Sequence, residues 1–160
     1  MKFMKCNQNL WTRVALIAAA ALLFMMTIPA SASLGGDVAS VQSDQAHMKA
    51  TVRVSGDIGY NVHEMKAAGG TAVREYVSNT GQVFGVAWDG PFRPNLQQVL
   101  GNYYNQFLNA AKNKRGGHNA PLVINERGLV VQMSGHQRHF VGRAYVPQML
   151  PQGVQAADIK

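Results

Sequence analysis

Residues 71–88 read TAVREYVSNTGQVFGVAW, and this stretch decides the fold. Its two halves, 71–77 and 82–88, are rich in Val, Tyr, Phe and Thr, the residue types that favour extended strands. Between the halves, Asn79, Thr80 and Gly81 supply residues that tolerate the positive φ angles of a tight turn. The stretch therefore predicts an antiparallel hairpin of two strands.

The residues after this hairpin predict one long helix. DGPFRP, at residues 89–94, ends the sheet because proline donates no hydrogen bond to a strand ladder. Asn95 is a good N-cap. Apolar residues then recur along one stripe of a helix at Leu96, Val99, Leu100, Tyr103, Phe107 and Ala111. Basic residues followed by glycines at 116 and 117 mark the end of this helix.

Further strand patterns lie on both sides of the hairpin and the helix, separated by turn residues. They occupy residues 51–54, 60–66, 122–125, 129–133 and 137–146, and residues 37–49 have a short helical pattern. Because the apolar stripe of the long helix has to be buried, we expect an α+β fold. In this fold an antiparallel β-sheet of about five or six strands carries the amphipathic helix on one face.

The first 32 residues have the pattern of a secretory signal peptide. Basic residues, the last of them Arg13, precede an uncharged run of 17 residues from Val14 to Ala30, and Ala30-Ser31-Ala32 is typical of a cleavage site. The alternative is an uncleaved membrane anchor, because a run of this length is near the lower limit for crossing a bilayer. We expect cleavage after residue 32, a single α+β domain at 33–146, a tail at 147–160 that either lies along the surface or is mobile, and a periplasmic or secreted location.

The charge and cysteine content of the predicted mature chain argue against some classes of function. The full chain has 15 Lys+Arg and 8 Asp+Glu; without the three cations of the signal segment, 12 Lys+Arg remain and the net charge falls from +7 to +4. So small a net positive charge argues against nucleic-acid binding, and so does the lack of aromatic residues interleaved among the basic ones. Cys6, the only cysteine, lies in the signal segment. The mature domain is therefore cysteine-free and is expected to fold without disulfides.

The sequence contains no catalytic or metal-binding motif. His136 and His139 are three residues apart, which on a strand would point their rings to opposite faces, so we expect no metal site and no cofactor. A small exported hydrolase with a site built from turn residues remains the alternative, with Ser134 and these two histidines as candidates. No G-x-S-x-G element accompanies the serine.

Two groups of residues are candidates for a binding role. Aromatic rings stack on a ligand and a guanidinium offers a planar donor fork, which favours a pocket for an anionic or sugar-like group at Trp88, Phe92, Arg93, Tyr103 and Tyr104. The alternative is that Trp88 and Phe92 only pin the proline-rich turn to the core. The second group is basic and would contact anionic lipid headgroups or cell-wall acids, unless it only caps the helix: Lys112, Lys114 and Arg115.

Five segments carry a resemblance to a known family: ASLGG at 32–36, REYV at 74–77, VFGVAWDGP at 83–91, LGNYY at 100–104 and GRAYVP at 142–147. They resemble small exported proteobacterial proteins catalogued as domain-of-unknown-function family 2844. The resemblance covers nearly all of the mature chain. It implies export and one domain, and it carries over no catalytic residue because the family has no assigned activity. Together with the composition, it favours a non-enzymatic binding or interaction module of the cell envelope, whose partner the sequence does not identify.

Overall fold

The computed structural model describes residues 34–37, 41–42, 45, 51–57, 59–67, 69–114 and 120–160. The predicted signal segment, most of the predicted helix at 37–49, and Arg115 lie outside these residues. No helix in the described part of the chain is long and apolar enough to cross a membrane.

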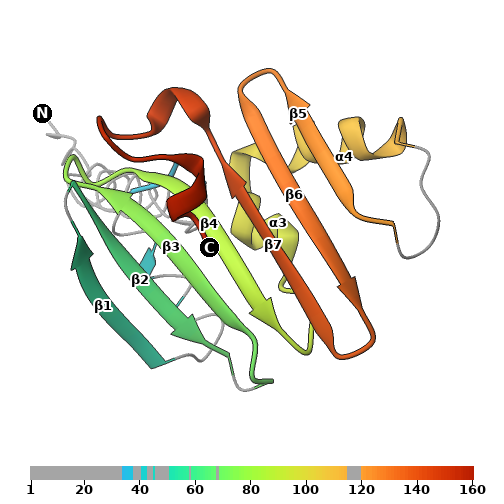
Figure 1. The fold of residues 1–160 in the computed structure, drawn as a ribbon, viewed down its shortest axis with the longest axis horizontal. Helices are drawn as coiled ribbons and strands as arrows, with labels where there is room; N and C mark the ends of the chain where they lie inside the picture. The colour runs from blue at the N-terminus through green and yellow to red at the C-terminus, as the bar shows by residue number, and fades with distance from the viewer. Residues whose placement is uncertain are drawn as a thin grey trace, which may run out of the picture.

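In the described part of the chain, seven strands form one antiparallel sheet in the order β1-β2-β3-β4-β7-β6-β5 (Figure 1). The strands are β1 (Thr51–Asp57), β2 (Tyr60–Lys66), β3 (Ala72–Ser78), β4 (Val83–Gly90), β5 (Leu122–Glu126), β6 (Leu129–His136) and β7 (His139–Tyr145). The α+β fold with an antiparallel sheet is confirmed. The expected number of five or six strands was wrong, because each of the seven segments with a strand pattern forms a strand of this one sheet. Strand β1 is also longer than the pattern at residues 51–54 indicated, since Gly56 and Asp57 continue its pairing with β2.

The hairpin predicted at residues 71–88 is confirmed as β3 and β4. Gly81 has φ +84°, the left-handed conformation that this turn requires and that glycine adopts at little cost. The amide of Gly81 donates to the carbonyl of Ser78 over 2.9 Å, which closes the turn. The local residue pattern was therefore sufficient to place this hairpin.

The predicted helix is present on one face of the sheet, but it is not continuous. Helix α3 (Leu96–Leu100) is followed by a 3-10 turn, η1 (Gly101–Tyr103), and then by α4 (Tyr104–Lys112). Asn95 is the N-cap as predicted, since its Oδ1 accepts hydrogen bonds from the amides of Gln97 and Gln98. Within α4, Phe107 and Ala110 are buried, and Ala111 is partly buried against the same core.

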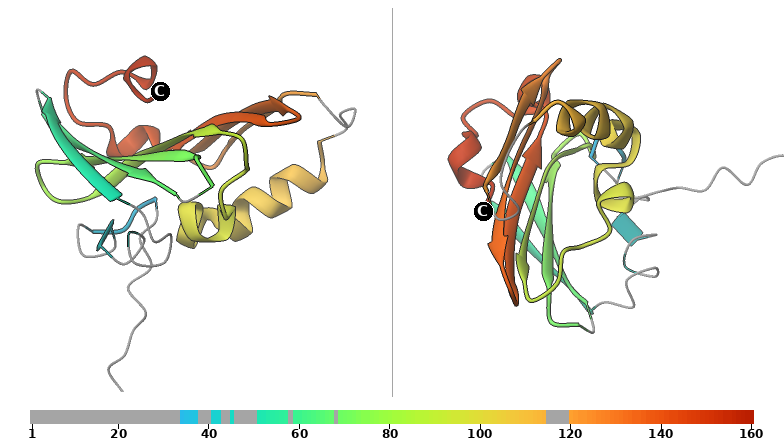
Figure 2. Two further views of the ribbon diagram at one scale, coloured as in Figure 1. Left: turned by 90° about the horizontal axis from the view of Figure 1, so that it is seen from below. Right: turned by 90° about the vertical axis from the view of Figure 1, so that its right-hand side faces the viewer.

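The sheet lies between two layers. The helices and residues 34–37 cover one face, and the residues after β7, including η2 (Pro147–Met149) and η3 (Ala156–Asp158), cover part of the other (Figure 2). The main core, with Trp88, Leu100 and Leu34 fully buried, fills the space between the helices and the sheet. A second, smaller core lies on the opposite face beneath Ile159. The polar face of the sheet around this smaller core carries the candidate site.

Candidate ligand-binding face of the sheet

One residue from each strand contributes to a row that crosses the whole sheet on the face opposite the helices. The registers place Arg53 beside Glu64, Glu64 beside Arg74, and Arg74 beside Ala87. The row continues through Arg143 and Gln132 to Val123. We call these seven residues the arginine row. Ala87, in the middle of this row, belongs to the same buried cluster as Ile159 near the end of the sequence.

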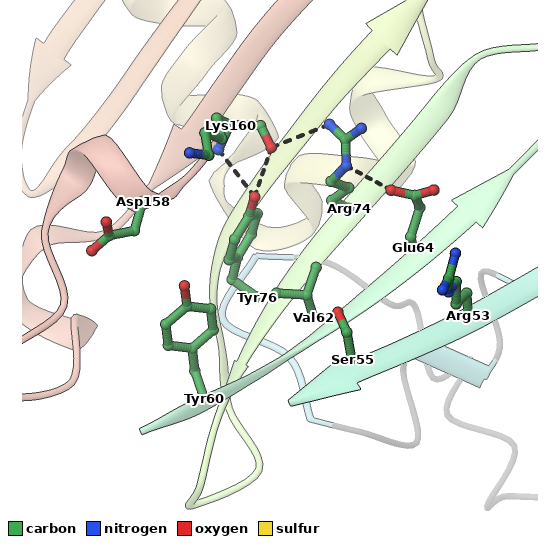
Figure 3. Close-up of a pocket in the computed structure, with 9 residues that line it drawn as sticks. All are labelled: Arg53, Ser55, Tyr60, Val62, Glu64, Arg74, Tyr76, Asp158 and Lys160. Carbon is green, nitrogen blue, oxygen red and sulfur yellow. Dashed lines mark hydrogen bonds and ion pairs between the residues drawn. The ribbon is translucent and has the colours of Figure 1, made fainter. Parts of the chain in front are cut away.

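Arg74 holds one side of this last segment. Its Nε donates to Oε2 of Glu64 over 2.7 Å, and its Nη1 donates to the main-chain oxygen of Lys160 over 3.2 Å (Figure 3). The hydroxyl of Tyr76 also donates to that oxygen, over 2.7 Å, and accepts from the amide of Lys160 over 3.0 Å. The backbone of Lys160 is therefore fixed by two side chains of β3.

Arg143 holds the other side. Its Nε donates to Oε1 of Gln132 over 2.8 Å, and its Nη1 donates to the carbonyl oxygens of Ala156 over 2.7 Å and Ile159 over 3.2 Å. Between the two arginines, the fully buried Ile159 side chain fills the space above Gly85. We call residues 156–160 the strap.

A polar hollow of about 510 Å³ opens on the β1 side of the strap. It is lined by charged and hydroxyl groups, among them Arg53, Ser55, Glu64 and Tyr60 (Figure 3). Burial raises the pKa of the Tyr60 phenol to about 12, helped by its 3.1 Å hydrogen bond to Asp57 and by the negative charge of that carboxylate. Tyr60 is therefore a neutral hydrogen-bond donor throughout the physiological pH range.

A second hollow, of about 590 Å³, opens on the other side of the strap, over β5, β6 and β7. We call it the valine hollow, because Val123 and Val141 line it and remain 50% and 40% exposed. Met133 and Pro121 extend its apolar wall. Three cations, Arg74, Arg143 and Lys160, line it against one acid, Asp89. This hollow thus combines apolar surface with an excess of positive charge.

The family comparison supports the resemblance noted in the sequence. The model of the family described as "Protein of unknown function (DUF2844)" matches residues 30–159. The chain belongs to this family. No curated protein and no solved structure matches it. The DUF2844 description assigns no activity, so function has to be inferred from the surfaces of the fold.

The five residues predicted to bind a ligand are distributed over several parts of this DUF2844 fold. Trp88 is only 1% exposed and packs within the main core, with part of it lining the valine hollow. Phe92 is 64% exposed on the turn after β4 and lies against Gly69. The Arg93 guanidinium lies 5.4 Å from the ring centre of Phe140, a cation–π contact.

Tyr103 is the last residue of η1 and Tyr104 is the first residue of α4, on the helical side of the sheet. The Tyr103 ring lies close to Gly35, and the Tyr104 ring stacks on Phe107 with a centroid separation of 6.3 Å. Of the five residues, only Trp88 lines either of the two hollows described above, and the role of the five in binding stays a prediction.

The predicted basic surface is described only in part. Lys112 is the last residue of α4 and Lys114 follows the helix, and both side chains are exposed. Arg115 lies outside the described residues. Contact of this surface with anionic groups therefore also stays a prediction.

The expectation that the His136 and His139 rings point to opposite faces was wrong. Gln137 and Arg138 form a tight turn, with Arg138 at φ +67°, so the two histidines are opposite each other on β6 and β7. Their ring centres are 5.7 Å apart. Among the described residues, no three His, Cys, Asp or Glu side chains lie close enough together to hold a metal ion.

The hydrolase candidates gather at the same end of the sheet. The Nδ1 atom of His139 is 3.7 Å from Oδ1 of Asp89, and both side chains are about half exposed. Ser134 lies on the same strand as His136, but within the described contacts its hydroxyl forms no hydrogen bond to either histidine. A serine nucleophile needs such a bond to a base, so these contacts do not assemble a catalytic serine.

Sequence reasoning missed the arginine row and the buried carboxyl group of Glu75. Glu75 is completely buried on β3, on the helix side of the sheet, opposite His63 of β2. Burial lowers the pKa of His63, which favours its neutral form. The alternation of Val73, Glu75 and Val77 along β3 was a usable signal for this position, because side chains two residues apart share a face.

Proposed function

We propose that this DUF2844 protein is an exported, non-enzymatic binding module of the periplasm or the extracellular space. Its ligand is an amphipathic anion, a molecule with an apolar chain and one carboxylate or phosphate group. The valine hollow is the binding site. The observation that carries this proposal is the coexistence, in one hollow of about 590 Å³, of exposed valines and three cationic side chains.

The chemistry of the lining supports this ligand class. Hollows of this size accommodate small ligands, and apolar walls supply most of the binding free energy. The guanidinium groups of Arg74 and Arg143 provide planar donors for an anionic head. Both arginines already hold main-chain oxygens of the strap, so their orientation is fixed before a ligand arrives.

Calorimetric titration of the purified protein with decanoate tests the ligand class. Decanol, which lacks the charge, and decyltrimethylammonium, which reverses it, are the comparison compounds. We expect saturable binding of decanoate and at least about tenfold weaker binding of both comparison compounds, equivalent to about 1.4 kcal/mol. Equal binding of all three would show a purely apolar interaction and contradict the proposal.

Exposed valines on the two faces of the sheet provide matched variants. Val141→Asp places a negative charge within the apolar wall and should weaken decanoate binding by about tenfold or more. Val54→Asp introduces the same change on β1, outside the valine hollow, at a residue that is 57% exposed. The Val54 variant should bind like the unmodified protein. If both variants lose binding equally, the valine hollow is not the site.

The export part of the proposal is supported by the basic start, the apolar run and the Ala30-Ser31-Ala32 site. Mass spectrometry of cell fractions after expression of the full chain tests it. We expect a species that begins at Ser33 in the periplasm or the medium. An uncleaved chain in the membrane fraction would instead support the retained anchor.

A further inference from the structure

Strand β1 forms one edge of the sheet that the described residues build. Six of its seven residues are exposed, including Val54 at 57%. An edge strand presents N–H and C=O groups on its outer side that have no neighbouring strand, and such an edge is a template for pairing with another strand.

β1 lacks several of the features that protect edge strands from pairing. Its sequence, TVRVSGD, contains no proline and no lysine, and it pairs with β2 over seven consecutive residues without a bulge. The opposite edge, β5, is shorter and lies beside α4. There Gln106 of α4 donates to the carbonyl oxygen of Glu126 over 2.6 Å. Of the two edges, β1 is therefore the more suitable for pairing.

The charges of β1 complement a second copy of the same strand. If two β1 strands pair antiparallel about a two-fold axis through Ser55, Arg53 lies opposite Asp57 of the partner subunit, and the reverse pair forms on the other side of the axis. Within the described part of the chain, Arg53 forms no ion pair, and Glu64, its neighbour on β2, is bonded to Arg74. An axis through Arg53 would instead oppose two like charges.

We infer that two copies of this protein associate through β1, antiparallel and centred on Ser55, so that one sheet continues across both subunits. The two Arg53–Asp57 pairs set the register, and the main-chain hydrogen bonds supply the association. Arg53 and Ser55 also line the polar hollow, so the hollows of the two subunits become neighbours. This inference does not depend on the ligand proposed for the valine hollow.

Sedimentation velocity over about 10 µM to 2 mM tests the inference. A single strand pair buries less surface than a standard stable interface, so we expect a dimer with a dissociation constant of about 100 µM. A protein that stays monomeric over this whole range would overturn the inference.

Charge reversals test the register. Arg53→Glu or Asp57→Arg alone opposes like charges at two places and should weaken the dimer by about tenfold or more. The double variant restores both pairs in reverse and should regain the original dissociation constant to within about threefold. Lys112→Glu, on an exposed helix end, is the charge-matched control and should leave association unchanged.

The two possible failures have separate meanings. Single reversals that leave the dimer intact would overturn pairing through β1. Single reversals that dissociate it, with no recovery in the double variant, would overturn the Ser55-centred register. Circular dichroism spectra of all four variants establish that a loss of dimer is not a loss of folding.

Discussion

The contact between Gly85 and Ile159 gives a sharp prediction about how the strap is held. A Cβ atom added at Gly85 would lie 2.7 Å from Cδ1 of Ile159, about 1 Å closer than a normal carbon–carbon contact. The φ of Gly85 is not in the left-handed region, so alanine fits the backbone there. The cost of Gly85→Ala should therefore come from the Ile159 side chain, at about 1–3 kcal/mol of unfolding free energy.

Ile159→Ala removes a completely buried side chain and should cost about 2–4 kcal/mol. In this background the atoms that crowd the added Cβ most closely are gone, because the three nearest atoms all belong to the Ile159 side chain beyond its Cβ. Gly85→Ala should then be nearly neutral, and the new methyl group should fill part of the cavity. The two changes are therefore expected to be non-additive by about 1–3 kcal/mol.

Urea unfolding of the four proteins in this cycle measures the coupling. The double variant should be more stable than the sum of the single changes implies. Additivity to within about 0.5 kcal/mol would refute the reasoning, because it would mean that Ile159 does not occupy the space above Gly85 in solution.

Three further outcomes are expected. Gly142→Ala should destabilise the protein by about 3 kcal/mol in urea unfolding, because its Cβ would lie 2.6 Å from Cε2 of the buried Trp88; a loss below about 0.5 kcal/mol would argue against this packing. Asn95→Ala should cost about 1 kcal/mol in the same assay through loss of the helix cap, whereas Asn95→Asp, which keeps an acceptor, should not. The pKa of Tyr60, raised from its usual value of 10.0 to about 12, contributes stability that is complete below pH 10 and is lost as pH rises towards 12. Ultraviolet titration should show one phenol ionising near 12 that disappears in Tyr60→Phe, and identical titrations of both proteins would contradict it.

The features that the sequence predicted well depend on residues close together in the chain. Asn79, Thr80 and Gly81 determine a turn without help from the rest of the fold, and Asn95 caps a helix through amides two and three residues later. Single-residue signals of this kind were sufficient for the hairpin and for the start of the helix.

The candidate site depends on contacts between distant residues, and these were not predictable. Arg74 of β3 and Arg143 of β7 share the arginine row only because both strands pair with β4 in one particular register. A shift of one residue in either pairing would turn the arginine of that strand to the other face. The His136–His139 prediction failed for a related reason, since a spacing of three means opposite faces on one strand but opposite positions across a tight turn.

The pairing of β4 with β7 also has a consequence for how the chain folds. Strands β1 to β4 follow one another both in sequence and in the sheet, as do β5 to β7, so each group needs only short loops to form. The β4–β7 pairs join the groups across at least 50 residues, from Gly90 to Phe140. Closing so long a loop costs more conformational entropy than closing a hairpin. We therefore expect the pairing of β4 with β7 to form last and to limit the folding rate. When the protein unfolds, we expect the sheet to separate first between these two strands.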